Sequence, residues 1–266
     1  SLKTSYLFSN RSLVWRNEDG GPSAEDNIDP ATGAFVPREV EKEDMNNITT
    51  ELRISQNYGL GNQKSTIAAG IRHSYAWFKR LGGGEGTTNS DFDLSITGDW
   101  GYDLDFTTTN LAPFVENIFK LSKNFTITPG FRFEYLRNTA KGHKETEGDI
   151  QITDEVRNRT FALAGLGLEL KSGKNTSIYA NISQAYRPID YSQLEPFGTS
   201  SRIDPNLKDS KGFNSDLGYR GTLRNYLNFD IGLFYMAYND RIGVTLATDP
   251  ITGDYYSLRK NIANSV

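Results

Sequence analysis

Very short and very long connections alternate along this chain, and that alternation constrains its fold more than any single residue does. Strand-like stretches are joined by tight turns at 59–62, 122–124, 172–175 and 224–226. Between the turns lie polar segments at 16–44, 80–106, 142–155 and 188–211. A sheet with short turns at one end and long loops at the other is typical of a membrane β-barrel.

The strand-like stretches alternate apolar and polar residues, which places each set on its own face of a sheet. In 126–135, for example, Phe131 and Phe133 alternate with Arg132 and Glu134. The stretches 161–170 and 227–238 show the same pattern. Alternation alone leaves open whether the apolar face meets lipid or a protein core.

The length of these stretches favours lipid. An ordinary strand averages about 5–6 residues, whereas a strand that crosses a bilayer at a tilt needs about 9–11. The stretches 64–79, 125–141, 156–171 and 227–247 all exceed that span. A soluble β-sandwich would need turn signals about every 8–12 residues, and such signals are missing here. The sequence therefore predicts an all-β fold, an antiparallel meander of about ten long strands that forms a segment of a transmembrane β-barrel.

Composition narrows the function classes. The chain has no Cys, so thiol nucleophiles and zinc thiolate sites are excluded. Its net charge of -4 has no basic run, so no nucleic-acid partner is expected. The two histidines, His73 and His143, show no spacing that suits a catalytic or metal site. We expect neither an enzyme nor a bound metal or cofactor.

Two local patterns predict details of the sheet. Aromatic residues near strand ends, among them Tyr75, Trp77 and Phe78, suit the girdle of a barrel at the membrane interface. The segments 29–33 and 249–253 share Asp-Pro at their start and Gly at their end. Asp before Pro with a closing Gly is turn chemistry, so these segments predict two similar turns.

Four motifs, in order along the chain, carry a resemblance to a known family. Asn-Leu-Ala-Pro-Phe-Val-Glu at 110–116 leads into Thr-Pro-Gly-Phe-Arg-Phe-Glu at 128–134. Ser-Gln-Ala-Tyr-Arg-Pro follows at 183–188, and Leu-Gly-Tyr-Arg-Gly at 217–221 precedes Tyr-Asn-Asp-Arg-Ile at 238–242. Together these segments resemble the barrel of TonB-dependent outer-membrane receptors, with ferric citrate receptors as the nearest subgroup.

The resemblance implies a location, partners and a function. It implies a receptor in the bacterial outer membrane that contacts lipid and takes up a ferric chelate, citrate-like or another siderophore, with energy from the TonB system. It further implies that residues 1–266 are the middle part of the barrel, without the plug domain and the C-terminal strands. The alternative is a passive porin-like barrel or a structural, adhesive one.

An anionic chelate requires guanidinium groups that face the lumen, because their planar fork binds carboxylates bidentately. Arg80, Arg137 and Arg187 lie near strand ends on the long-loop side. Arg72 and Arg132 alternate with apolar neighbours and should point into the lumen. We predict these five arginines as ligand-binding residues. The alternative is that they pair with other wall charges or with the plug.

The two outermost strands, 2–15 and 254–263, would leave unpaired edges. Unsatisfied backbone groups are costly in lipid and recruit other chains in water. The sequence therefore predicts that this piece closes on itself into a smaller barrel, pairs edge to edge with another copy, or owes its boundaries to proteolysis; the first two are favoured because they restore the missing hydrogen bonds.

Overall fold

The computed structural model describes residues 1–15, 28–88, 92–146, 149–189, 201–224, 226–251 and 253–265. Strands make up about 80% of the described residues, which contain no helix that could cross a membrane. The predicted all-β fold is confirmed. The strands are β1 (Leu2–Trp15), β2 (Glu39–Leu60), β3 (Gln63–Glu85), β4 (Tyr102–Lys120), β5 (Phe125–Thr146), β6 (Asp149–Lys171), β7 (Thr176–Arg187), β8 (Ser201–Ile203), β9 (Ser210–Leu223), β10 (Leu227–Thr248) and β11 (Tyr255–Ser265).

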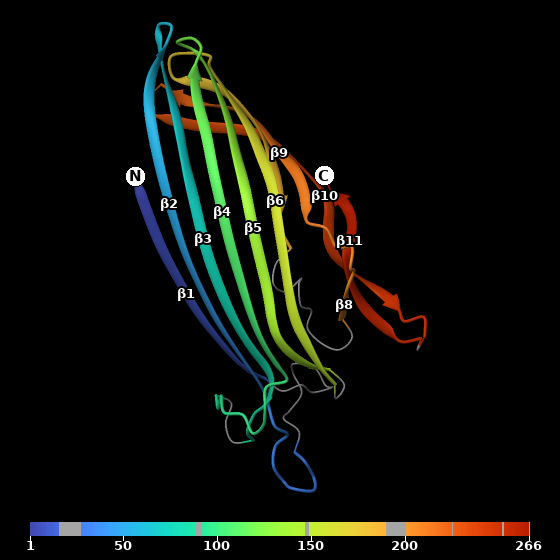
Figure 1. The fold of residues 1–266 in the computed structure, drawn as a ribbon. Coiled ribbons are helices and arrows are strands. Elements are labelled where there is room, and N and C mark those ends of the chain that lie inside the picture. The colour runs from blue at the N-terminus through green and yellow to red at the C-terminus, as the bar shows by residue number, and fades with distance from the viewer. Residues whose placement is uncertain are drawn as a thin grey trace.

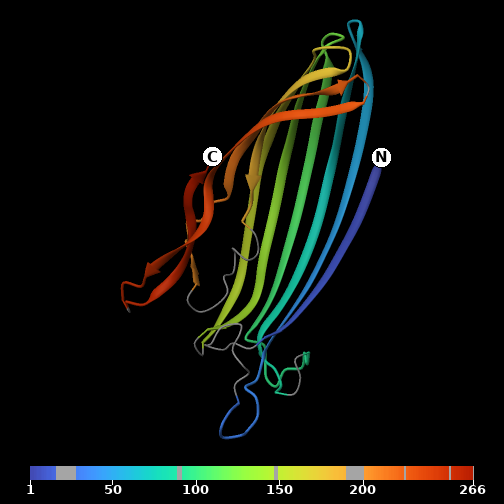
Figure 2. The ribbon, with the colours of Figure 1, turned by 180° about the vertical axis from the view of Figure 1, so that it is seen from behind.

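All strands belong to one 11-stranded sheet with the order β1-β2-β3-β4-β5-β6-β7-β9-β10-β11-β8. Neighbours are antiparallel except β8, which runs parallel to β11 over three residue pairs. The sheet curls strongly, so that β9 to β11 stand apart from β1 across the hollow (Figures 1 and 2). It does not close: within the described chain β1 pairs with β2 alone. The predicted closure of the single chain on itself is therefore wrong, and association with a second copy stays a prediction.

Short turns and long connections lie at opposite ends of the sheet, as the alternation predicted. Figure 1 shows the β2–β3, β4–β5 and β6–β7 turns together at the top and the connections after β1 and β3 at the bottom. One expected loop is wrong. The described parts of 142–155, residues 142–146 and 149–155, are strand, because β5 and β6 stay in register as far as Thr146 and Asp149. The connection expected at 80–106 is also shorter, since β3 ends at Glu85 and β4 begins at Tyr102.

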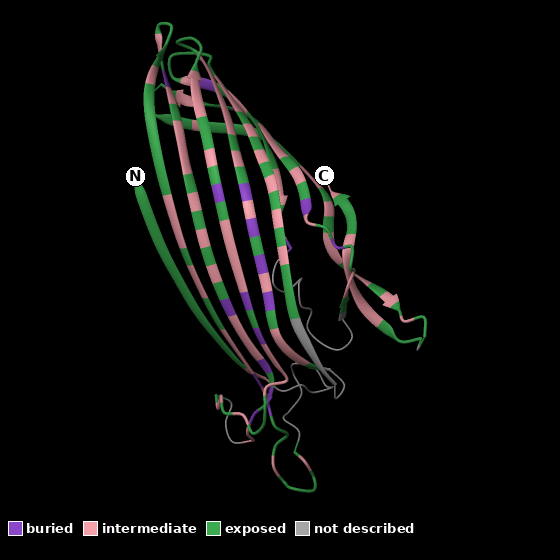
Figure 3. Ribbon diagram, in the orientation of Figure 1, coloured by how far each residue is buried: buried purple, intermediate pink, exposed green. Residues whose placement is uncertain are grey.

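The concave face is identified by side chains that reach across a strand. The hydroxyl of Tyr179 on β7 donates to the carboxylate of Asp230 on β10 at 2.9 Å, passing over β9. The registers then place Gly130 and Gly165 on this inner face, because they lie in the same pocket wall as Tyr179. On β5 even-numbered residues face inward, and on β6 odd-numbered residues do. Bands of burial along β4 and β5 follow this alternation (Figure 3).

Many exposed apolar side chains lie on the outer face. They include Phe131, Leu166, Ile231 and Leu233, the last with 75% of its surface exposed. Tyr75 and Trp77 also lie on this face, with ring centroids 5.6 Å apart. Their placement fits the predicted girdle.

Phe78 does not belong to the girdle, because its even position turns it inward. There it packs against Phe106, with ring centroids 5.7 Å apart, in a small cluster that also holds Leu104 and Ala140. The prediction for Phe78 was therefore wrong.

The two Asp-Pro segments form nearly identical turns, as predicted. In the first, the N–H of Gly33 donates to the carbonyl of Asp29 at 2.8 Å. In the second, the N–H of Gly253 donates to the carbonyl of Asp249 at 2.9 Å. Both glycines have positive φ, 70° and 80°, which a residue with a side chain adopts only at a cost.

Candidate ligand-binding wall

The sheet can be divided along one inner-face row, Gly70–Phe114–Arg132–Leu163, whose members are paired in register across β3 to β6. We call the part from this row towards the long connections the long-loop half, and the remainder the short-turn half. The inner face of the long-loop half carries buried polar side chains such as Glu134 and Asn138. The inner face of the short-turn half is more exposed to solvent. A ligand that enters from the long-loop end would meet this half first.

The first polar cluster of the long-loop half surrounds Glu134 on β5, which is buried. Its carboxylate forms an ion pair with Arg132 and accepts a hydrogen bond from the Asn110 amide at 2.5 Å. Four residues further along β5, the amide of Asn138 donates to the hydroxyl of Thr108 at 2.7 Å. Strands β4 and β5 are thus cross-linked by side chains as well as by their backbones.

The second cluster bridges a gap in the wall. Strands β6 and β7 are paired only from Gly165 and Ser183 to the short-turn end. Beyond that point Tyr186 of β7 stacks on Phe161 of β6, with ring centroids 3.6 Å apart. The aromatic pair therefore holds the two strands together where their backbones no longer do.

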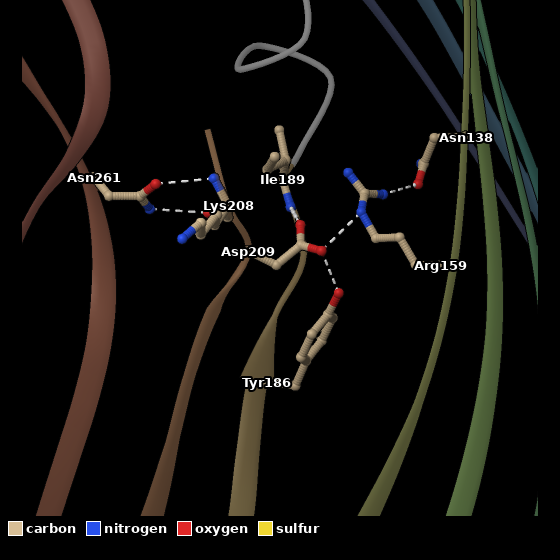
Figure 4. Close-up of polar contacts among 7 residues, drawn as sticks. All are labelled: Asn138, Arg159, Tyr186, Ile189, Lys208, Asp209 and Asn261. Carbon is tan, nitrogen blue, oxygen red and sulfur yellow. Dashed lines mark hydrogen bonds and ion pairs between the residues drawn. The ribbon is translucent and has the colours of Figure 1, made fainter. Parts of the chain in front are cut away.

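Asp209, just before β9, joins the two sides of this gap (Figure 4). One carboxylate oxygen lies 2.8 Å from Nε of Arg159 on β6 and accepts a hydrogen bond from the Tyr186 hydroxyl. The other accepts the N–H of Ile189 at 2.9 Å. The side chains of Arg159 and Asp209 are only 10% and 13% exposed, so this is a buried ion pair. Burial of such a pair requires additional hydrogen bonds, which Tyr186 and Ile189 supply.

A third set of contacts ties the same segment to the far strands. The amide of Asn261 on β11 accepts from the N–H of Lys208 at 2.8 Å and donates to its carbonyl at 2.9 Å (Figure 4). The hydroxyl of Ser210 donates to the carbonyl of Asp240 on β10 at 2.9 Å. The segment 207–210 is therefore fixed from both sides and has little freedom to move.

A pocket of about 630 Å³ opens at this junction. That volume lies in the range of small-molecule sites, about 300–1,000 Å³. Both cationic and aromatic side chains line it: Arg157, Arg159, Lys208, Lys211, Phe161 and Tyr186, together with Asp209 and Asp240.

Three of the five predicted arginines lie on the inner wall. Arg132 is paired with Glu134, as described, and Arg80 is paired with Glu43 at 3.0 Å. Arg72 lies opposite Glu51 and makes no ion pair with a described residue. Arg72 and Arg132 flank β4, which separates their strands by about 10 Å.

The other two arginines are placed differently. Arg137 is exposed and lies on the outer face, because it shares odd positions of β5 with Phe131 and Phe133. It does not belong to the lumen wall, and its prediction as a ligand-binding residue is wrong in that respect. Arg187 is exposed at the end of β7, opposite Ser210, at the rim of the gap.

Arg159 was missed by the sequence analysis, although a signal for it was present. The apolar residues of 164–170 occupy even positions, so the same alternation extended back along the strand would have placed Arg159 on the inner face. Its partner Asp209 could not be found in this way, because it precedes a strand and belongs to no alternating pattern.

Comparison with known proteins agrees with the geometry. The family model described as "TonB dependent receptor-like, beta-barrel" matches residues 1–265. The chain belongs to this family. A comparison with curated protein sequences found no significant match.

Solved structures show the same fold at low sequence identity. The unliganded ferric citrate transporter FecA superposes with a TM-score of 0.70 at 20% identity, over 90% of this chain and 32% of FecA. The outer-membrane ferripyoverdine receptor of Pseudomonas aeruginosa gives 0.63 at 14% identity, over 97% of this chain and 34% of that one. The alcaligin receptor FauA of Bordetella pertussis gives 0.55 at 13%, over 98% and 41%. The chain thus corresponds to between a third and two fifths of these receptors.

Proposed function

We propose that this chain is the ligand-facing wall of an outer-membrane receptor that takes up a ferric chelate, citrate-like in its charge, with energy from the TonB system. The proposal rests on family membership together with one observation: arginines gather on the inner face of the long-loop half. Arg72, Arg80 and Arg132 line that wall, and Arg187 lies at its rim. Guanidinium groups suit the carboxylates of an anionic chelate.

The composition of the chain favours recognition of a whole chelate over direct binding of a soft or borderline metal ion by the wall. Soft or borderline metals prefer thiolate, thioether and imidazole ligands. The 266 residues contain no Cys, two Met and two His, against 29 Lys and Arg. The receptor would therefore hold the iron through the charge and the oxygens of its chelator. The plug domain implied by the family would face the same wall and connect it to TonB.

Uptake of labelled iron tests the proposal. Cells that lack the gene should lose accumulation of ferric citrate or of another anionic ferric chelate, and the intact gene should restore it. The double variant Arg72→Gln/Arg132→Gln should reduce uptake about tenfold or more, since a charge-assisted hydrogen bond contributes about 1.5–3 kcal/mol. The matched control is Arg137→Gln, the same change on the outer face, which should leave uptake unchanged. Undiminished uptake of every ferric chelate after deletion would overturn the proposal.

A further inference from the structure

One terminal nitrogen of Arg159 has no hydrogen-bond partner among the described residues. A guanidinium offers five N–H groups, one on Nε and two on each terminal nitrogen. Nε pairs with Asp209 at 2.8 Å, and Nη1 donates to the Asn138 side chain at 2.7 Å. Nη2 is buried and has no hydrogen-bond partner. Buried charged donors without a partner are rare in folded proteins, because water is lost and nothing replaces it.

The unused nitrogen points towards the pocket at the gap. In Figure 4 the third nitrogen of Arg159 extends from the guanidinium on the side of Ile189, away from Asn138. Arg159 and Ile189 both line the 630 Å³ pocket. A ligand that enters the pocket and displaces the cover of Nη2 could therefore accept from this nitrogen without breaking the contacts of Arg159 with Asp209 and Asn138.

The charges of the pocket favour an anion. Four of its lining side chains are cationic, Arg157, Arg159, Lys208 and Lys211, and two are anionic, Asp209 and Asp240. Their formal balance is +2. Neither Lys208 nor Lys211 forms a side-chain ion pair with any described residue, and both are exposed. Two mobile cations and one fixed, buried guanidinium together form a site that fits a carboxylate-bearing molecule.

The aromatic pair gives the pocket a second, less polar side. Phe161 and Tyr186 stack at 3.6 Å between centroids, and the Tyr186 hydroxyl is already committed to Asp209. These rings offer a rigid apolar surface next to the donors. Such a combination of apolar wall and few convergent polar groups is characteristic of a specific small-molecule site.

We propose that the pocket between β6 and the segment 207–211 is a binding subsite for an organic polycarboxylate, and that Nη2 of Arg159 donates to one of its carboxylate oxygens. Lys208 and Lys211 neutralise its remaining charge from the exposed side. This inference rests on the proposed function and deepens it, because the same carboxylate could arrive free or as part of a ferric chelate. The proposal gives the gap between β6 and β7 a role in ligand binding, in addition to the five arginines predicted from the sequence.

The test is calorimetric titration of the full-length receptor with iron-free citrate, with inorganic phosphate as a second probe. The intact receptor should bind citrate, and Arg159→Lys should weaken binding about tenfold, since lysine keeps the charge for Asp209 but lacks the second terminal nitrogen. The matched control is Arg220→Lys, an exposed inner-face arginine paired with Glu169 at 3.1 Å outside this pocket, which should leave citrate affinity unchanged.

A second variant covers the case in which Arg159→Lys does not fold. Lys208→Gln/Lys211→Gln alters two exposed side chains and leaves the buried network intact. It should weaken citrate binding and reduce its dependence on salt. Citrate affinity that is unchanged in every folded variant would overturn the subsite. Equal affinity for phosphate would overturn its assignment to polycarboxylates.

The outcome is separate from the test of the proposed function. If the receptor transports ferric citrate and Arg159→Lys binds citrate as tightly as the intact protein, the subsite is refuted and the receptor function stands. If deletion of the gene leaves iron uptake unchanged, the receptor function is refuted, and calorimetry alone decides whether the subsite exists.

Discussion

The inner faces of the two halves of the sheet carry different kinds of side chains. In the long-loop half, inner side chains bind one another: Glu134 holds Arg132 and Asn110, and Asp209 holds Arg159. In the short-turn half, Gly130 of β5 and Gly165 of β6 are paired in register on neighbouring strands. Both line a hollow of about 640 Å³. Each half keeps a hollow of similar size, about 630 and 640 Å³, but the long-loop hollow borders a buried, hydrogen-bonded network and the short-turn hollow is lined by glycines.

The outer faces differ along the same division. In the short-turn half the outer positions of β5 and β6 are apolar, as Pro129, Leu166 and Leu168 show. In the long-loop half one complete row across six strands is polar and alternates in charge from Asp44 onward: Asn10, Asp44, Lys79, Asp105, Lys141 and Asp154. Such a row has no place in hydrocarbon. The short-turn half is therefore the part suited to lipid, and the long-loop half projects beyond it.

The largest expected effect comes from breaking the buried pair of the long-loop half. Asp209→Ala should lower the free energy of unfolding of the receptor by about 3–5 kcal/mol, because Arg159 would remain buried without its counter-charge. The comparable pair of the short-turn half, Arg220 and Glu169, is 51% and 39% exposed. Glu169→Ala should cost about 0–1 kcal/mol. Denaturant unfolding of both variants in lipid measures the difference, and equal losses would show that the halves do not differ.

The next effect concerns the outer face. Leu166→Arg places a charge between Pro129 and Ile182, in the apolar region of the short-turn half. It should destabilise the lipid-inserted barrel by about 2–4 kcal/mol, as expected near the bilayer midplane. Val156→Arg makes the same kind of change on the same strand and face, in the long-loop half. It should cost about 0–1 kcal/mol, as near an interface. Equal costs in a lipid unfolding titration would place both positions at the same depth.

Sequence reasoning succeeded where strands alternate strictly and failed where both faces are polar. The short-turn half was predicted closely, because Ile127, Phe131 and their neighbours mark one face without ambiguity. The segment 142–155 was taken for a loop because it is polar throughout. Its described residues are strand because their backbones pair in register across β5 and β6, from Gly142 with Thr153 to Thr146 with Asp149. Tertiary pairing of this kind leaves no periodic signal in one sequence.

The candidate wall shows the same limit. Alternation was enough to place Arg132 inward, and used consistently it would have placed Arg137 outward and Phe78 inward. Alternation could not predict the gap between β6 and β7. Strand β7 leaves β6 beyond Ser183 because of contacts with distant segments, which a local pattern does not record. Asp209 acquires its role only from the folded chain.

The smallest expected effect is a difference in the pH dependence of two turns, one at each end of the sheet. At the long-loop end, the N–H of Ala31 and the hydroxyl of Thr32 donate to the Asp29 carboxylate, and these bonds hold its pKa below the ordinary 3.8. At the short-turn end, the hydroxyl of Ser122 accepts the N–H groups of Asn124 and Phe125, and a hydroxyl does not titrate there.

A lowered pKa in the folded state means that the carboxylate stabilises its turn above the pKa of the unfolded chain. That contribution is lost as the pH falls through the folded-state pKa of Asp29. Acid should therefore loosen the turn 29–34 before it affects the turn 121–125, and hydrogen exchange of the Gly33 amide, which donates to the Asp29 carbonyl at 2.8 Å, reports the loosening. Asp29→Asn keeps an acceptor oxygen but removes the titration, so the protection factor of its Gly33 amide, relative to the intrinsic exchange rate at each pH, should no longer fall in acid. An unaltered pH profile in that variant would show that the Asp29 carboxylate does not control the turn.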